Sequence, residues 1–81
     1  MDINGKTLVI TGGASGIGRA LACEAMRRGA SVALADINLE GVRDSQSRAA
    51  AAAVSGARCT AHRLDVASLD DWLVFRSLVL Q

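Results

Sequence analysis

The sequence predicts an α/β fold in which a parallel β-sheet is covered by α-helices. Short, mostly apolar segments that suit buried strands alternate along the 81 residues with longer segments whose apolar residues recur at helical spacing. The first apolar segment also runs into a cluster of glycines, as a strand does before a tight turn into a helix. This β-α-β-α-β-α order favours parallel strands joined by right-handed crossovers, with the strands in the spatial order 3-2-1.

The first predicted strand covers residues 6–11, KTLVIT, a β-branched run that indicates a buried strand. Residues 16–28 follow, and their apolar members recur at the spacing of one helix face: Ile17, Leu21, Ala22, Ala25 and Met26. Arg27 and Arg28 suit the negative end of the helix dipole, and Gly29 suits the position just after the last turn. We therefore expect a helix that ends at Arg28.

The second strand and helix are predicted in the same way. Residues 31–36, SVALAD, form a continuous apolar run that ends in a carboxylate, which is typical of a strand buried on both faces. Asn38 stands where it can cap the next helix. We expect that helix to run through the five alanines at 49–53 and to end at Gly56.

The third predicted strand covers residues 57–66, ARCTAHRLDV, and its mixture of polar and apolar residues suits an edge strand. Ser68, with Asp71 three residues later, resembles a capping box and predicts the start of a third helix. We expect that helix to reach the chain end near Gln81, with Trp72 in the core. Its predicted apolar face includes Leu69, Trp72, Leu73 and Phe75.

The composition is that of a small globular domain, with 51% hydrophobic and 21% charged residues. Nine basic and eight acidic residues are spread along the chain, so we expect no nucleic-acid partner and no anionic membrane partner. No apolar run approaches the roughly 20 residues that cross a bilayer, and no secretory signal is recognisable, so we expect a cytoplasmic protein. Cys23 and Cys59 match neither a metal spacing nor a disulfide framework; we expect no metal site and two small buried side chains.

Residues 11–18, TGGASGIG, lie between the first predicted strand and helix and carry the sharpest functional signal. Gly12 would allow a tight turn out of the strand, Gly16 would let the backbone approach a pyrophosphate, and Gly18 would permit close helix–strand packing. The helix N-terminus would offer N–H groups and a partial positive charge to the phosphates. A P-loop is disfavoured, because that pattern needs Lys and Ser or Thr after Gly18, where this chain has arginine and alanine.

The G-x-G-x-x-G/A pattern also fails, because it would begin at Gly16 and need a small residue at Leu21. The spacing that fits is T-G-x3-G-x-G, and here the chain resembles the cofactor loop of the short-chain dehydrogenase/reductase family. Asp36 ends the second strand, where a dinucleotide fold places its ribose-binding acid. Asp65-Val66 ends the third strand, like the family's Asp-Val pair beside the adenine ring. These features end successive strands, where open α/β sheets bind ligands.

The resemblance implies that residues 1–81 are the first part of a Rossmann-like, doubly wound NAD(P)-binding domain, with the remainder of the fold absent. It implies that the complete parent is an oxidoreductase that interconverts alcohols and carbonyls by hydride transfer. Ser15 and Ile17 would contact the phosphates, Ile17 through its backbone N–H, and the backbone beside Ile37 would lie along the adenosine. The full set of implied cofactor-binding residues is Gly12, Ser15, Gly16, Ile17, Gly18, Asp36, Ile37, Asp65 and Val66.

We expect the cofactor to be NAD rather than NADP. Asp36 can accept hydrogen bonds from both ribose hydroxyls. A 2′-phosphate there would bring like charges within roughly 4–5 Å, which costs on the order of 3–4 kcal/mol per pair at an effective dielectric near 20. In the family, NADP preference usually shows as a basic residue at the place of Ser15 or Ile37, and neither is basic here. We expect Arg19 to be a solvated residue of the first helical turn and His62 to lie at the surface or an interface.

No catalytic residue of the family can be placed in this chain. The family uses a tyrosine with a lysine four residues later, whereas this sequence has no tyrosine and its one lysine is Lys6. We therefore expect the chain to be inactive alone and, with an open sheet edge, weakly folded, aggregation-prone or dependent on a partner. The complete parent is expected to be a homo-oligomer. Two alternatives stay open: a non-catalytic NAD-binding or regulatory module, or an assembly element, either of which truly ends at Gln81.

Overall fold

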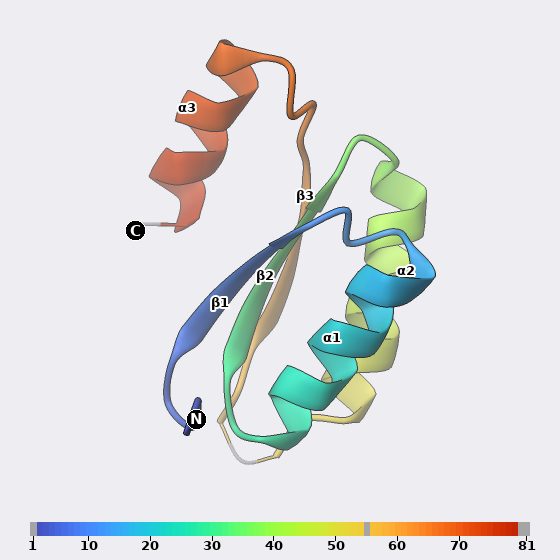
Figure 1. Ribbon diagram of the computed structural model, residues 1–81, viewed down its shortest axis with the longest axis vertical. Coiled ribbons are helices and arrows are strands. Elements are labelled where there is room, and N and C mark those ends of the chain that lie inside the picture. Colours follow the sequence, from blue (N-terminus) through green and yellow to red (C-terminus); the bar gives the residue numbers. More distant parts are fainter. Residues whose placement is uncertain (1, 55, 80–81) are drawn as a thin grey trace.

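The computed structural model describes residues 2–54 and 56–79, in which three strands and three helices alternate (Figure 1). All three strands are parallel, and β2 lies between β1 and β3. This confirms the predicted α/β fold and strand order, since 3-2-1 and 1-2-3 are the same sheet counted from opposite edges. The elements are β1 (Thr7–Thr11), α1 (Gly16–Arg27), β2 (Ser31–Asp36), α2 (Leu39–Ala51), β3 (Cys59–Arg63) and α3 (Leu69–Val79).

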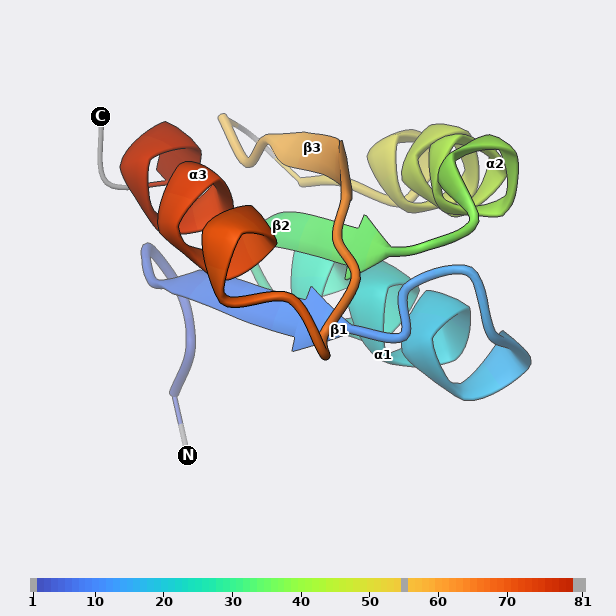
Figure 2. The same ribbon diagram turned by 90° about the horizontal axis from the view of Figure 1, so that it is seen from above.

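The helices cover the sheet unequally. Both α1 and α2 lie on one side of the sheet and α3 lies on the other, as the view along the strands shows (Figure 2). We call these sides the α1–α2 face and the α3 face. Right-handed crossovers explain the arrangement, because the first two connections step along the sheet in the same direction and so place their helices on the same side.

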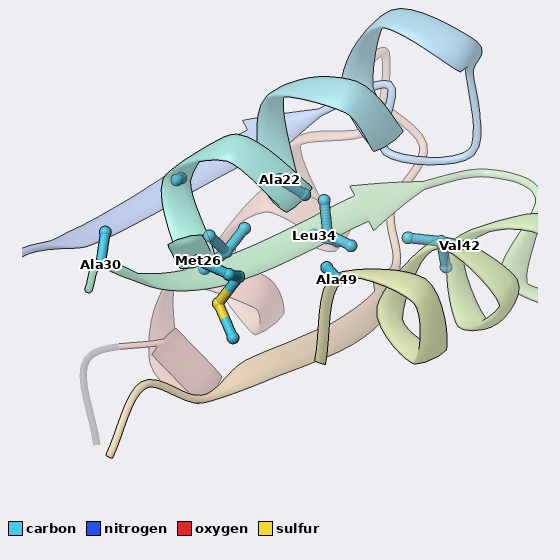
Figure 3. Packing of buried hydrophobic residues seen from close by; sticks show 8 residues of the cluster. Ala22, Met26, Ala30, Leu34, Val42 and Ala49 are labelled. Atoms are coloured by element: carbon cyan, nitrogen blue, oxygen red, sulfur yellow. The ribbon is translucent and has the colours of Figure 1, made fainter. Parts of the chain in front are cut away.

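The middle strand β2 is buried on both faces, as its continuous apolar sequence predicts. Val32 and Leu34 belong to the core of the α1–α2 face, and Ala33 and Ala35 belong to that of the α3 face. The first core is the larger (Figure 3), and its buried members are Ala22, Ala25, Met26, Ala30, Val32, Leu34, Val42 and Ala49. The second consists of Ala33, Ala35, Leu64 and Phe75.

The second helix ends earlier than predicted, at Ala51 rather than at Gly56. The N–H of Ala53 bonds the carbonyl three residues before it, at 3.2 Å, which tightens the last turn. The N–H of Val54 then donates to the carbonyl of Met26 at 3.3 Å and ties the chain to the end of α1. The alanines favour helix, but the need to return to the sheet sets where the helix stops.

The other boundaries differ from the predictions by smaller amounts. The third strand is limited to Cys59–Arg63, rather than 57–66, because the strand pairing with β2 covers these residues and continues on each side only as one flanking backbone bond, at Arg58 and at Leu64. It is an edge strand, as its polar residues predict. The first helix ends at Arg27, with Arg28 as its C-cap, one residue before the predicted end. Gly29 follows with φ +86°, the left-handed conformation expected of a glycine after a helix.

The expectation that β1 is buried is wrong. Its residues alternate between exposed and half-buried, and Val9 is 49% exposed. Leu8 and Ile10 pack against the core of the α1–α2 face. The outer edge of β1 pairs with no strand of residues 2–54 and 56–79, and α3 covers its other face incompletely.

The predicted apolar face of α3 is also largely uncovered. Phe75 is buried, whereas Leu69 and Leu73 are exposed, and Trp72 is 36% exposed rather than in the core. The helix therefore rests on the sheet mainly through one aromatic side chain. None of the helices in the described part of the chain is long and apolar enough to cross a membrane.

The two cysteines are half-buried rather than fully buried. Both pack against the core of the α1–α2 face, and both are free thiols. Burial, together with the neighbouring Cys23, raises the pKa of the Cys59 thiol to about 11. Cys59 is therefore protonated at neutral pH and serves as an apolar filler.

Candidate functional site

The carboxyl ends of the three strands meet at one edge of the sheet and border a groove of about 350 Å³. The strand register aligns Thr11 with Ala35, and Asp36 with Arg63, so the three following loops begin side by side. The residues that line the groove are Thr11, Gly12, Asp36, Ile37, Leu64, Asp65 and Val66. Five of the nine predicted cofactor-binding residues are among them, and the other four lie in the adjoining turn and the start of α1.

Two glycines of the loop have a clear structural reason. Gly12 has φ +71°, a left-handed conformation that side chains other than glycine rarely adopt. A Cβ atom on Gly18 would collide with the carbonyl oxygen of Gly12. A Cβ atom on Gly16, in contrast, would meet nothing within 4 Å, so this residue borders open space. The loop is therefore tightly packed at Gly18 and open at Gly16.

Ser15 caps α1 and organises the loop. Its Oγ accepts a hydrogen bond from the N–H of Gly18 at 3.0 Å and donates one to the carbonyl of Gly12 at 2.7 Å. The N–H groups of Gly16 and Ile17 have no acceptor among the described residues. These two donors stand at the positive end of the helix dipole, the position at which helices bind phosphate.

Asp36 holds the loop against the end of β2. One of its carboxylate oxygens, Oδ2, accepts from the N–H of Ala14 at 3.0 Å, and the other, Oδ1, accepts from the N–H of Asn38 at 3.0 Å. The carbonyl of Ala35 also accepts from the N–H of Gly13 at 2.9 Å. A carboxylate has about four lone-pair sites, so Asp36 keeps capacity to accept from further donors. The sequence pattern singled out Asp36 but gave no sign of its bond to Ala14.

The turn after β3 forms the opposite wall of the groove. Asp65 closes it, because its Oδ1 accepts from the N–H of Ala67 at 3.0 Å and its carbonyl accepts from the N–H of Ser68 at 2.9 Å. The side chain of Val66 is exposed beside the groove, as is that of Ile37. These two apolar side chains flank the groove at the loops after β2 and β3.

The start of α3 secures this turn in a way that the sequence only partly predicts. Ser68 Oγ accepts from the N–H of Asp71 at 3.2 Å, which is one half of the predicted capping box. The other half is missing, because the Asp71 carboxylate accepts from the N–H of Asp65 at 2.9 Å and pairs with Arg63 at 3.2 Å. Trp72 Nε1 donates to the carbonyl of Val66 at 2.8 Å. Asp71 and Trp72 therefore support the site although neither was predicted to.

The expectation of a solvated Arg19 is wrong. Arg19 Nε donates to Ser45 Oγ at 3.0 Å, and its Nη2 lies 2.9 Å from the carboxylate of Asp44. Ser45 is fully buried, and these bonds join α1 to α2. The guanidinium of Arg19 thus belongs to the packing of the two helices, since a residue of the first turn can reach a neighbouring helix as well as solvent.

His62 lies on the edge strand but is half-buried under α3. Its ring meets that of Phe75 edge-on, with 5.1 Å between the centroids, and its Nε2 is 2.8 Å from Thr60 Oγ1. Burial lowers the pKa of His62, so the neutral imidazole is favoured. Across residues 2–54 and 56–79, no group of three His, Cys, Asp or Glu side chains could hold a metal ion.

The strand-end groove presents N–H groups that can donate to an anion, the carboxylate of Asp36, and the apolar side chains of Ile37 and Val66.

Comparison with known proteins gives a consistent result. A family model described as short chain dehydrogenase matches residues 6–77. A sorbitol dehydrogenase of Cereibacter sphaeroides is 52% identical over 73 residues, which cover 86% of this chain and 26% of that protein. The crystal structure of NAD⁺-bound xylitol dehydrogenase matches with a TM-score of 0.89 at 25% identity. The matched region covers 99% of this chain and 30% of the xylitol dehydrogenase chain. A metagenomic short-chain oxidoreductase in complex with NADP has a TM-score of 0.85 at 30% identity, with 99% and 35% covered. The chain spans about a quarter of the length of the curated relatives it matches.

Proposed function

Because the chain belongs to the short-chain dehydrogenase/reductase family, we propose that it forms the part of an NAD(P)-binding domain that holds the adenosine and pyrophosphate of the cofactor. The observation that carries this proposal is the meeting of three kinds of group at one groove. N–H donors without an acceptor among the described residues lie at the start of α1, a carboxylate ends β2, and exposed apolar side chains flank the loops after β2 and β3.

Each group matches one part of a dinucleotide. The N–H groups of Gly16 and Ile17 would donate to the pyrophosphate, and the open space beside Gly16 would admit it. Asp36 would accept from the ribose hydroxyls. The adenine would lie between Ile37 and Val66, at the turn that Asp65 closes. Gly12 and Gly18 would act through the shape of the loop, and Ser15, which is exposed, would contact the phosphates as well as cap α1.

We further propose that NAD is preferred over NADP. A 2′-phosphate would meet the carboxylate of Asp36, and the guanidinium nearest to the loop in sequence, that of Arg19, is bound to Asp44 and Ser45. Repulsion between like charges roughly 4–5 Å apart costs on the order of 3–4 kcal/mol at an effective dielectric near 20.

The parent protein would interconvert an alcohol and a carbonyl, with the nicotinamide of the bound cofactor accepting or giving the hydride. This chain would bind and orient the adenosine half. The acid–base chemistry and the choice of substrate would come from residues outside the 81, since the sequence contains no tyrosine.

Titration of the full 81-residue chain with NADH tests the proposal, with energy transfer from Trp72 to the reduced nicotinamide as the signal. We expect saturable binding, weakened about tenfold or more by Asp36→Ala, because bonds to charged groups contribute about 1.5–3 kcal/mol. NADPH should bind more weakly than NADH. Glu40→Ala is the matched control, because it removes an exposed carboxylate in the first turn of α2, outside the groove. Absence of saturable binding by a chain with a folded circular dichroism spectrum would refute the proposal.

A further inference from the structure

The carboxylate of Asp36 already forms hydrogen bonds within the protein when no ligand is bound. Both of its oxygens accept from backbone N–H groups, one in the glycine loop and one at the start of α2. We propose that Asp36 is a positioning residue for the pyrophosphate loop in addition to an acceptor for the ribose. The ligand side of this inference rests on the function proposed above, whereas the contact with the loop exists in the protein alone.

Ala14 lies between two parts of the glycine loop that are each held by other hydrogen bonds. Bonds within the loop fix its second half, since Ser15 bonds to Gly12 and Gly18. Its first half is fixed by the bond from Gly13 to the carbonyl of Ala35. Between these halves, the N–H of Ala14 donates to Asp36, which is half-buried and charged. Charge-assisted bonds are stronger than bonds between neutral groups, so this contact sets the path of the chain into α1.

The same carboxylate reaches α2 through Asn38. Asn38 donates its N–H to Asp36 and caps α2, because its Oδ1 accepts from the N–H of Gly41 at 3.0 Å. Ala14 lies against the same turn, since a Cβ atom on Gly41 would come within 2.8 Å of the Ala14 Cβ. Asp36 therefore joins the glycine loop, the end of β2 and the first turn of α2.

This arrangement couples two parts of the ligand through one side chain. A substitution that adapts residue 36 to a different ribose also removes the acceptor for Ala14, and so displaces the N–H donors that follow it. Loss of a negative charge would by itself favour an anion. Weaker pyrophosphate binding after Asp36→Ala would therefore be a consequence of loop position and not of charge.

Amide hydrogen exchange of the ligand-free 81-residue chain tests the positioning role directly. In Asp36→Ala, we expect the amides of Ala14 and Asn38 to exchange at least about tenfold faster. The amide of Val32, which bonds to the carbonyl of Arg58 at 2.8 Å, should keep its protection and so report an intact sheet. Unchanged exchange at Ala14 in a variant that still protects Val32 would overturn the inference. If Asp36→Ala unfolds, Asp36→Asn decides, because it keeps one acceptor oxygen and should expose only one of the two amides.

Binding of ADP and of 2′,3′-dideoxy-ADP, which lacks both ribose hydroxyls, separates the two roles of Asp36. If Asp36 positions the loop, Asp36→Ala binds the dideoxy compound at least about threefold more weakly than the original chain does. Equal affinity for the dideoxy compound, with a loss confined to ADP, would leave Asp36 as a ribose acceptor only and overturn the inference. Failure of the original chain to bind either nucleotide would count against the proposed function, and hydrogen exchange would then decide the positioning role alone.

Discussion

The two faces of the sheet differ in how completely they are covered. On the α1–α2 face, two helices bury eight residues in one cluster, and Arg19 joins the helices through Ser45 and Asp44. On the α3 face, four residues are buried, and an apolar groove of about 440 Å³ remains between Val9 and α3. The glycine loop and Asp36 belong to the well-packed face, and the Asp65-Val66 turn belongs to the other. The strand-end groove thus has one firmly packed wall and one that depends on the start of α3.

The largest difference between the faces should appear when the same substitution is made on each. Leu34→Ala removes a fully buried side chain of the α1–α2 face and should lower the free energy of unfolding by about 2–5 kcal/mol. Leu73→Ala removes a side chain that is 51% exposed on α3 and should cost less than about 1 kcal/mol. Urea denaturation followed by circular dichroism measures both. Equal losses would show that α3 is as firmly packed as α1 and α2.

A second pair of substitutions separates packing from ligand access on the firm side. In Gly18→Ala the new Cβ meets the carbonyl of Gly12, a backbone atom, so we expect a loss of about 1–3 kcal/mol in stability. In Gly16→Ala the Cβ enters open space, so thermal stability should change by less than about 1 kcal/mol while NADH binding weakens. Thermal denaturation and the Trp72 titration give the two readouts. Normal NADH binding by Gly16→Ala would show that the phosphates do not approach this residue.

The sequence also predicts the α1–α2 face of the sheet better than the α3 face. Gly12, Asp36 and Asp65 could be placed at one edge of the sheet because each ends a strand or follows one within two residues, and parallel strands end together. Helical spacing on α3 predicted which residues form an apolar face, but spacing does not say whether another part of the chain covers that face. For this reason Trp72, which was expected in the core, is 36% exposed, and Leu73, which was expected on the apolar face, is 51% exposed.

Long-range hydrogen bonds were the other feature that the sequence did not reveal. Arg19 with Ser45, Asp71 with the N–H of Asp65, and Ala14 with Asp36 each join residues from different elements. Local patterns predict capping within a helix turn, as at Ser68, because donor and acceptor are three residues apart. Local patterns do not predict which neighbouring helix or strand a longer side chain will contact.

The wall of the groove that depends on α3 can be tested through the hydrogen bond from the Trp72 indole to the carbonyl of Val66. Trp72→Phe keeps the aromatic packing against Phe75 but removes the donor to the carbonyl of Val66. We expect a stability loss of about 0.5–1.5 kcal/mol and faster amide exchange in the turn at residues 65–67. Exchange at Ala14, on the firm wall, should not change. Faster exchange on both walls would mean that they move together.

The smallest expected effect concerns His62, beneath α3. Burial lowers its pKa from the ordinary 6.5, so the folded state binds the proton less readily than the unfolded state does. Its contribution to stability is therefore complete above about pH 6.5 and is lost as the pH falls through the unfolded and then the folded pKa. We expect a loss of less than about 1 kcal/mol, visible as a difference between the original chain and His62→Gln in urea denaturation at pH 7.5 and 5.5. An identical pH dependence in the two proteins would mean that α3 leaves the imidazole in water, and that the α3 face is more open than its contact with Phe75 indicates.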